Sequence, residues 1–259
     1  MVAKALTIAG SDSGGGAGIQ ADLKAFSAIG VYGASVITAV TAQNTQAVSA
    51  IHPIPDEVVT AQIKAVLSDI QIDAIKIGML GTPSLIEAVA DAISGFEGPV
   101  VLDPVMVAKS GDVLLADSAI DALKSHLLPR ATLLTPNLPE AAKLVGSGAV
   151  EDQAQALLGL GVGAVVMKGG HGIGDICTDH LVTSAGTRSF AAPRVNTRNT
   201  HGTGCTFSSA IAAFMAQGRT LPDAVARAHT WLNKAILAAD QLNVGQGHGP
   251  VHHFHELWA

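Results

Sequence analysis

Cys205 stands in a short segment that could bind an anion. It follows Gly202-Thr203-Gly204, and the apolar residues after it recur at a spacing that predicts a helix starting near Gly204 or Cys205. A glycine-rich turn at the start of a helix directs several free backbone N–H groups to one place, and the positive end of the helix dipole adds to them. A thiol at this position usually has a lowered pKa. A helix cap with a small buried cysteine explains the same residues equally well.

A second set of polar residues could hold a metal ion. Asn137-Leu138-Pro139-Glu140 follows one expected strand, and Asp103 ends another. Proteins bind Mg²⁺ through few carboxylates together with waters and phosphate oxygens, so Glu140 with Asn137, assisted by Asp103, would be sufficient. Proline and glutamate are also ordinary residues of a first helical turn. For each acid taken alone, a structural role is the better interpretation.

Lys168 lies between an expected buried strand and Gly169-Gly170, where the rim of a pocket would be. It could bind a phosphate oxygen as a point charge. A solvated side chain is the commoner case for a lysine at the end of a strand.

Three other motifs do not point to a ligand. No G-x-x-x-x-G-K-[ST] occurs in the chain, and the G-x-G that begins at Gly14 has Ile19 where the dinucleotide motif needs Gly or Ala. The loop at 14–18 still allows a close backbone approach to a ligand. The C-terminal histidines lack the spacing of a metal site, so packing of the tail is favoured for them; they are His248, His252, His253 and His255.

These candidate residues must be positioned by the elements around them. Short apolar runs alternate with runs at helical spacing, which predicts an α/β fold: a mainly parallel central sheet with helices on both faces. The expected strands are 5–9, 34–41, 74–77, 99–102, 131–134 and 164–167, with an extended piece at 48–54 and a hairpin at 176–182 and 187–191. Besides the helix after Gly202, the expected helices are 19–29, 55–67, 83–93, 118–128, 138–144, 152–160 and 221–239.

Polar and glycine residues gather where the expected strands end. In open α/β sheets, ligands bind beyond the carboxyl ends of the strands. The residues at those ends are Gly10-Ser11-Asp12, Gln43-Asn44, Gly78-Met79, Asp103, Asn137 to Glu140 and Lys168-Gly169-Gly170. Because such ends meet at one edge of a parallel sheet, we expect a single ligand site there.

The composition excludes several classes of protein. The chain has 259 residues, of which 48% are hydrophobic, and no linker or repeat divides it, so one domain over 1–259 is expected. A net charge of −6 and only 3% aromatic residues argue against nucleic-acid binding. Apolar runs are too short for a membrane span, and no secretory signal is evident. The only cysteines, Cys177 and Cys205, form no disulfide framework, so a soluble cytoplasmic protein is expected.

Ordered blocks along nearly the whole chain resemble one family. They resemble the bacterial hydroxymethylpyrimidine/phosphomethylpyrimidine kinases, the thiamine-biosynthesis branch of the ribokinase-like family. The blocks are Ala9 to Asp12, Gly15 to Lys24, Tyr32-Gly33, Thr41 to Thr45, Lys76 to Leu80, Leu102 to Met106, Thr135 to Ala141, Met167 to His171, Asn199 to Thr206 and Gly247 to His253. One departure is Ser13-Gly14, where many members carry Pro-Ser.

The resemblance implies a fold, an activity and cofactors. The fold would be a ribokinase-like three-layer sandwich. The activity would be two successive ATP- and Mg²⁺-dependent phosphorylations of 4-amino-5-hydroxymethyl-2-methylpyrimidine, first to the monophosphate and then to the diphosphate. A homodimer is what the family suggests. The runner-up substrate is pyridoxal or a related vitamin B6 alcohol, and a non-catalytic pyrimidine-binding sensor on the same fold is the alternative from another class.

The resemblance also implies roles for individual residues. Gln43 matches the residue that hydrogen-bonds the aminopyrimidine, with Asp22 and Gly10 as neighbours and Met79 and Val105 as apolar walls. The remaining matches are Asn137 and Glu140 for the Mg²⁺-associated motif, Lys168 for a phosphate-contacting lysine, and Gly202, Thr203, Gly204 and Cys205 for the anion hole.

Cys205 is the expected proton acceptor of the first step. It stands where sugar kinases of the wider family carry an aspartate base, and cysteine there is the pattern of this branch. As a thiolate it would take the proton of the hydroxymethyl group. The second step has a phosphate acceptor, which is already ionised near neutral pH and needs no base.

Overall fold

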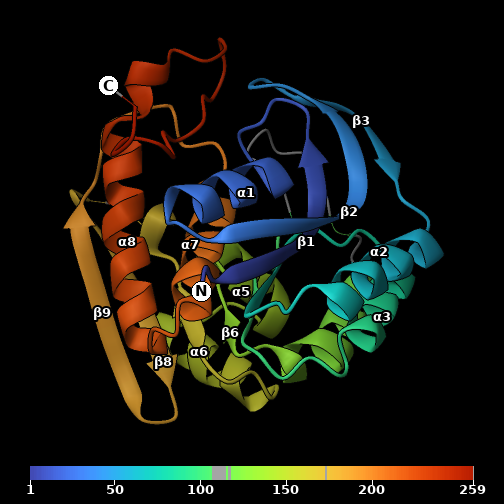
Figure 1. Ribbon diagram of the computed structural model, residues 1–259. Helices are drawn as coiled ribbons and strands as arrows, with labels where there is room; N and C mark the ends of the chain where they lie inside the picture. Colours follow the sequence, from blue (N-terminus) through green and yellow to red (C-terminus); the bar gives the residue numbers. More distant parts are fainter. Residues whose placement is uncertain (107–114, 116–117, 173, 259) are drawn as a thin grey trace.

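The chain is built on a central sheet whose inner strands are parallel (Figure 1). The computed structural model describes residues 1–106, 115, 118–172 and 174–258. Within these residues nine strands form one sheet in the order β3-β2-β1-β4-β5-β6-β7-β8-β9. From β2 to β7 neighbours pair in parallel, and β3, β8 and β9 add antiparallel edges. The strands are β1 (Lys4–Asp12), β2 (Tyr32–Gln43), β3 (Val48–Pro53), β4 (Ala74–Ile77), β5 (Val100–Leu102), β6 (Leu133–Leu134), β7 (Val165–Met167), β8 (Ile176–Thr183) and β9 (Gly186–Pro193).

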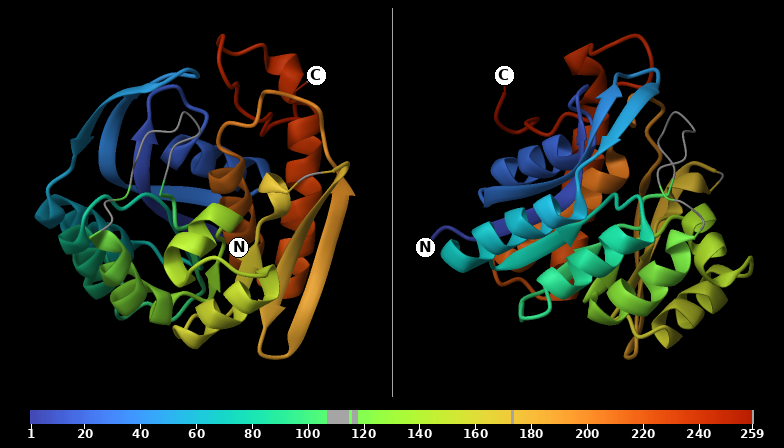
Figure 2. Two further views of the ribbon diagram at one scale, coloured as in Figure 1. Left: turned by 180° about the vertical axis from the view of Figure 1, so that it is seen from behind. Right: turned by 90° about the vertical axis from the view of Figure 1, so that its right-hand side faces the viewer.

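Helices cover both faces of the sheet (Figures 1 and 2). One face carries α2 (Asp56–Asp69), α3 (Pro83–Ala92), α4 (Ala119–Ala122), α5 (Leu138–Val145) and α6 (Val150–Gly159). The other face carries α1 (Gly18–Ala28), α7 (Thr203–Ala216) and α8 (Leu221–Leu237). Alternation lets a single strand contribute to both cores, as in β1, where Leu6 and Ile8 belong to the first core and Ala5 to the second. The predicted α/β sandwich is therefore confirmed.

The main departure from the expected elements lies at 118–128. One continuous helix was expected there, but α4 is followed by a π-helical turn, η1 (Leu123–Leu127), and a 3-10 turn, η2 (Leu128–Arg130). Leu123, Leu127 and Leu128 are all buried, and Pro129 in η2 has no N–H to continue an α-helix. Apolar burial and the proline together set this irregular path.

The remaining elements differ from expectation mainly at their ends. β1 and β2 extend further than predicted, and the extended piece at 48–54 pairs with β2 as β3. Two further 3-10 turns are η3 (Gly169–His171) and η4 (Ala239–Leu242). The sequence also makes the segments 43–53 and 170–175 candidates for mobility around a bound substrate. Residue 173 of the second segment lies outside the described residues. Of the helices the structure describes, none is long and apolar enough to cross a membrane.

Candidate active site

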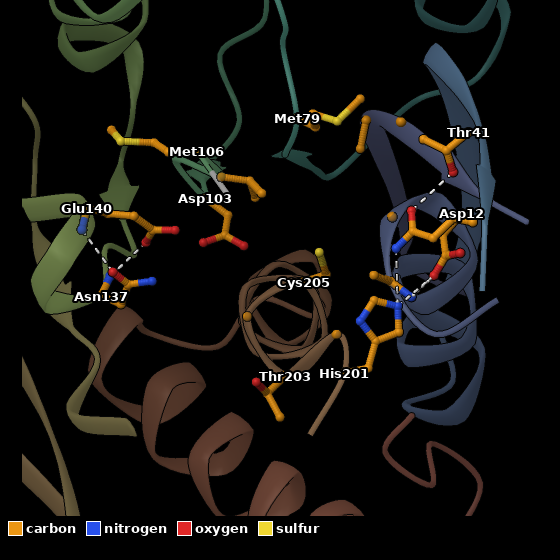
Figure 3. Close-up of a pocket in the computed structure, with 18 of the residues that line it drawn as sticks. Asp12, Thr41, Met79, Asp103, Met106, Asn137, Glu140, His201, Thr203 and Cys205 are labelled. Atoms are coloured by element: carbon orange, nitrogen blue, oxygen red, sulfur yellow. Dashed lines mark hydrogen bonds and ion pairs between the residues drawn. The ribbon is translucent and has the colours of Figure 1, made fainter. Parts of the chain in front are cut away.

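A cavity of about 470 Å³ lies at the carboxyl ends of the parallel strands, beside the start of α7 (Figure 3). The predicted convergence of strand-end residues is therefore found in the structure, while the individual roles stay predictions. Among the predicted site residues, only Asp22 does not line the cavity. Those that do are Gly10, Gln43, Met79, Asp103, Val105, Asn137, Glu140, Lys168, Gly202, Thr203, Gly204 and Cys205.

The turn that opens α7 is shaped by Gly202. This residue precedes Thr203, the first residue of the helix, and its φ of 76° is left-handed, which favours glycine. A Cβ at Gly202 would overlap the carbonyl oxygen of Gly16, so the loop 14–18 packs backbone to backbone against the turn. The first N–H groups of a helix lack intrahelical acceptors, and residues 202–205 all line the cavity. The geometry suits an anion.

Cys205 lies in the first turn of α7 and faces the cavity (Figure 3). Burial raises the pKa of its thiol to about 11, and the Lys76 ammonium is the largest opposing influence. The lowered thiol pKa predicted from the helix start is therefore wrong, because desolvation outweighs the favourable field at this position.

Lys168 is held between two acids and is not a solvated lysine. Its Nζ lies 2.8 Å from Asp103 Oδ1 and 3.7 Å from Glu140 Oε2. Burial acts to lower the Lys168 pKa, but the two carboxylates outweigh it, so the pKa is raised and the ammonium stays charged. Burial raises the pKa of Glu140 against the pull of Lys168. The cavity therefore holds a fixed positive charge on its wall.

Asn137 and Glu140 form a capping box at the start of α5. Glu140 N–H donates to Asn137 Oδ1 at 2.8 Å, and Asn137 N–H donates to Glu140 Oε2 at 2.7 Å. Asn137 and Glu140 therefore have the structural role at the start of a helix that the sequence also allows. In the described residues, no cluster of three or more His, Cys, Asp or Glu could hold a metal by itself. Oxygen donors from Glu140, Asn137 and Asp103 fit a Mg²⁺ ion that keeps most of its waters.

Gln43, Met79, Val105 and Gly10 also line the cavity. In Figure 3, Met79 and Thr41 lie across the start of α7 from Glu140 and Asn137. Gln43 Oε1 accepts a hydrogen bond from Thr41 Oγ1 at 3.1 Å. A Cβ on Gly10 would lie 2.6 Å from Met79 Cε, so glycine leaves room for the methionine wall. This side offers an amide and an apolar surface, which suit a small aromatic ring.

Asp22 lies behind the cavity wall and has no exposed surface. Its carboxylate accepts hydrogen bonds from Thr7 Oγ1 at 2.6 Å and Ser209 Oγ at 2.7 Å. Lys76 Nζ lies 2.9 Å from both carboxylate oxygens. Because these four bonds occupy the carboxylate, the structure leaves Asp22 no direct contact with a ligand in the cavity.

Two cavity residues, Asp12 and His201, received no role from the sequence, although Asp12 stands among the strand-end residues expected at the site. His201 Nε2 lies 2.9 Å from Asp12 Oδ2, and Gln43 Nε2 lies 3.5 Å from His201 Nε2. Burial acts to raise the Asp12 pKa, but hydrogen bonds from His201 and from the amides of Ala17 and Gly14 outweigh it, so the pKa is lowered. An ionised carboxylate only accepts, so His201 Nε2 donates this hydrogen bond. The only signal in the sequence is that His201 directly precedes the glycine turn.

The C-terminal tail packs against α7 and α8. Thr206 Oγ1 lies 2.9 Å from His253 Nε2, and Trp231 contacts the rings of His253 and His255. Burial lowers the pKa of His253 to about 3, so its ring is neutral. The tail therefore supports the first turn of α7 from behind, in line with the packing role favoured for these histidines.

These features define a class of protein. A mainly parallel sheet whose strand ends carry a glycine-rich helix start, a fixed lysine and a pair of acids is the arrangement of a ribokinase-like α/β phosphotransferase.

Comparison with known proteins narrows the class. The family model described as phosphomethylpyrimidine kinase matches residues 12–252. The chain is 53% identical to a hydroxymethylpyrimidine/phosphomethylpyrimidine kinase of Rhizobium meliloti, covering 100% of this chain and 99% of that one. It is 51% identical to the enzyme of the same name from Escherichia coli, covering 98% of each. The chain belongs to the phosphomethylpyrimidine kinase family.

A solved structure agrees with this assignment. The ADP complex of a Bacillus subtilis pyridoxal kinase superposes with a TM-score of 0.90 at 36% identity and covers 100% of both chains. The fold is therefore that of the vitamin kinases, and the neighbour binds an adenine nucleotide.

Proposed function

We propose that this chain uses ATP to phosphorylate 4-amino-5-hydroxymethyl-2-methylpyrimidine to its monophosphate and then to the diphosphate used in thiamine biosynthesis. One observation carries this proposal. In one cavity, the turn at Gly202 to Cys205 lies between Met79 with Thr41 on one side and Glu140 on the other (Figure 3). Gln43 is bonded to Thr41, and Lys168 lies beside Glu140. The first side suits the pyrimidine, and the second suits the phosphates of ATP.

The acceptor is held by the apolar side of the cavity. The amide of Gln43 pairs with the amino and ring nitrogens of the pyrimidine, because it offers both a donor and an acceptor. Met79 and Val105 enclose the ring, and Gly10 leaves room for it. This orients the hydroxymethyl oxygen towards the start of α7.

The transferring phosphoryl group is stabilised by fixed charges and dipoles. The first-turn N–H groups at Gly202 to Cys205 donate to its oxygens, and Lys168 neutralises its charge. Asp103 keeps Lys168 oriented until the nucleotide is bound. Glu140, Asn137 and Asp103 are the residues that would hold Mg²⁺ through its waters. When bound, that ion would neutralise negative charge on the phosphates of ATP.

The two steps differ in their need for a base. In the first step the hydroxymethyl oxygen attacks phosphorus, the bond from phosphorus to the ADP oxygen breaks, and Cys205 as thiolate takes the hydroxyl proton. In the second step the attacking oxygen belongs to a phosphate that already carries negative charge. Cys205 is then dispensable, while Lys168 and the turn at Gly202 are needed in both.

Product analysis tests the proposal directly. The protein is incubated with hydroxymethylpyrimidine, ATP and Mg²⁺, and the mono- and diphosphate are followed over time. We expect the monophosphate to appear first and the diphosphate to follow. ATP consumption that does not depend on the pyrimidine, or no consumption at all, would favour a pyrimidine sensor and overturn the assignment.

Pyridoxal is the competing substrate, because the superposed Bacillus subtilis neighbour is a pyridoxal kinase. Gln43 favours an aminopyrimidine edge, which pyridoxal lacks. We therefore expect a higher kcat/KM for hydroxymethylpyrimidine than for pyridoxal in a side-by-side assay, and a clear preference for pyridoxal would reverse the choice.

We further propose that residues 1–259 act as one kinase domain and that the protein works as a homodimer in the cytoplasm. The single sheet that contains all described strands supports the first point, and the family resemblance supports the second. Light scattering of the purified chain checks the oligomeric state, since a mass near 26.2 kDa would mean a monomer.

A further inference from the structure

Lys76 is a charged side chain at a position where the fold otherwise places apolar residues. All four residues of β4 are buried, and Lys76 has no exposed surface. Ile75 and Ile77 belong to the core under α2 and α3, so alternation directs Lys76 to the opposite face, towards α1 and α7. An ammonium in this layer requires a partner.

That partner is Asp22 of α1, and the pair is fully hydrogen-bonded. Lys76 Nζ lies 2.9 Å from each carboxylate oxygen, and Thr7 and Ser209 donate to the same carboxylate. Replacing a buried ion pair by well-packed apolar residues is often neutral or stabilising. Stability alone therefore does not explain a fixed pair at this place.

The pair is bonded to α7, the helix that carries Cys205. Ser209, which bonds Asp22, stands four residues after Cys205 and so on the same face of α7. Lys76 and Cys205 both line the active-site cavity.

Four charged groups around the thiol act on its ionisation. Burial is the main reason for the raised pKa of Cys205; Lys76 lowers this pKa, while Asp22 and Asp103 raise it. The fourth group is Lys168, whose own raised pKa reflects Asp103, Glu140 and Cys205 among its causes. Of these groups, Lys76 has the largest influence on the thiol.

We propose that Lys76, held in place by Asp22, is a positioning residue that sets how readily Cys205 gives up its proton. The thiol releases this proton to solvent to form a thiolate beside the Lys76 ammonium. The thiolate then takes the hydroxymethyl proton while the new O–P bond forms and ADP leaves. The catalytic consequence rests on the proposed kinase function, whereas the effect on the thiol does not.

Two isosteric variants separate this electrostatic role from a structural one. Lys76→Met removes the positive charge and leaves Asp22, and Asp22→Asn removes the negative charge and leaves Lys76. Each variant leaves an unpaired buried charge and so destabilises the fold, which thermal unfolding measures. Their effects on Cys205 have opposite signs: Lys76→Met disfavours the thiolate and Asp22→Asn favours it.

The readout is the rate of alkylation of Cys205 by iodoacetamide against pH, resolved by peptide mass spectrometry. Cys177, on β8, serves as the control within the same molecule. We expect a change of about tenfold or more in Cys205 alkylation at a fixed pH below its pKa, down in Lys76→Met and up in Asp22→Asn. The rate at Cys177 should stay as in the unmodified chain.

The outcomes are decisive in each case. Shifts of the same sign in both variants, or no shift in either, would overturn the proposal and leave the pair a structural feature. If Lys76→Met does not fold, Asp22→Asn and the neutral double variant Lys76→Met with Asp22→Asn still test it. We expect the Cys205 titration of the double variant to lie at higher pH than that of Asp22→Asn. Failure of the unmodified protein to phosphorylate hydroxymethylpyrimidine would refute the proposed function without changing these titrations.

Discussion

Substitution of Gly202 by alanine tests whether the start of α7 must be placed accurately for phosphoryl transfer. The residue has a φ of 76°, and a Cβ there would overlap the Gly16 carbonyl oxygen. A left-handed conformation costs an alanine about 1–2 kcal/mol. The collision is with backbone on both sides, so relief requires the turn and the loop 14–18 to move apart, at about 1–3 kcal/mol for overpacking.

The displacement should affect catalysis as well as folding. A misplacement of about 1 Å can lower the rate about 10²-fold, which corresponds to about 2.7 kcal/mol in the transition state. We therefore expect kcat of both phosphorylations to fall about 10²-fold in Gly202→Ala. The loss in unfolding free energy should be about 2–5 kcal/mol, the sum of the strain and the overpacking.

Gly218→Ala is the matched control. Gly218 follows α7, its φ is 78°, and a Cβ there would meet no atom within 4 Å. This variant should lose only the about 1–2 kcal/mol of left-handed strain and should keep both activities. Stopped-assay kinetics measure the rate of each phosphorylation in each variant. Chemical denaturation measures the unfolding free energy of each variant. If Gly202→Ala keeps both rates within about threefold, which is under 1 kcal/mol in the barrier, the turn does not act as a fixed oxyanion-type site.

Four further predictions concern the site. Cys205→Ala should slow the first phosphorylation about 10²–10⁴-fold and leave the second nearly unchanged, and an equal loss in both steps would refute its role as a base. Because the Cys205 pKa is raised to about 11, the first-step rate should rise with pH through the neutral and mildly alkaline range while the second does not. Lys168→Met should lower both steps about 10²–10³-fold, measured in the same product assay. Asp12 has a lowered pKa from its ordinary 3.8, so its contribution to stability is complete above that value and is lost as the pH falls through the lower folded pKa. In Asp12→Asn, the unfolding free energy should therefore depend less on pH in this acid range, which chemical denaturation at a series of pH values measures.

The sequence was sufficient for the architecture and for most of the cavity wall. Alternating apolar runs fixed the parallel strands to within a few residues, and their carboxyl ends had to meet at one edge of the sheet. This is why residues as distant as Gly10, Asp103 and Lys168 could be assigned to one site before any coordinates. The irregular path through η1 and η2 could not be read in the same way, because one π-helical turn is too short to break the helical spacing of the apolar residues around it.

The charges of the site were harder to predict than its positions. A cysteine at a helix start suggested a lowered thiol pKa, yet burial reverses the sign at Cys205. Desolvation depends on every neighbour in three dimensions, and no local pattern reports it. The Asp12–His201 contact joins residues 189 positions apart, so only the folded chain shows it.

Asp22 shows how a residue can belong to a site without contacting a ligand. The resemblance places Asp22 beside the substrate. In the structure, the four hydrogen bonds of its carboxylate instead link Lys76 to β1 and to α7, the helix that carries Cys205. A sequence match of this kind reports that a residue type is needed at a position and leaves open which atom it serves. The lysine in the middle of Ala74-Ile75-Lys76-Ile77 was the overlooked signal, because a buried strand accepts a charge only when a partner and a use for that charge lie nearby. If the opposite shifts expected for Lys76→Met and Asp22→Asn are found, the acidity of the anion-site cysteine is set by the sheet below α7 as well as by the helix that carries it.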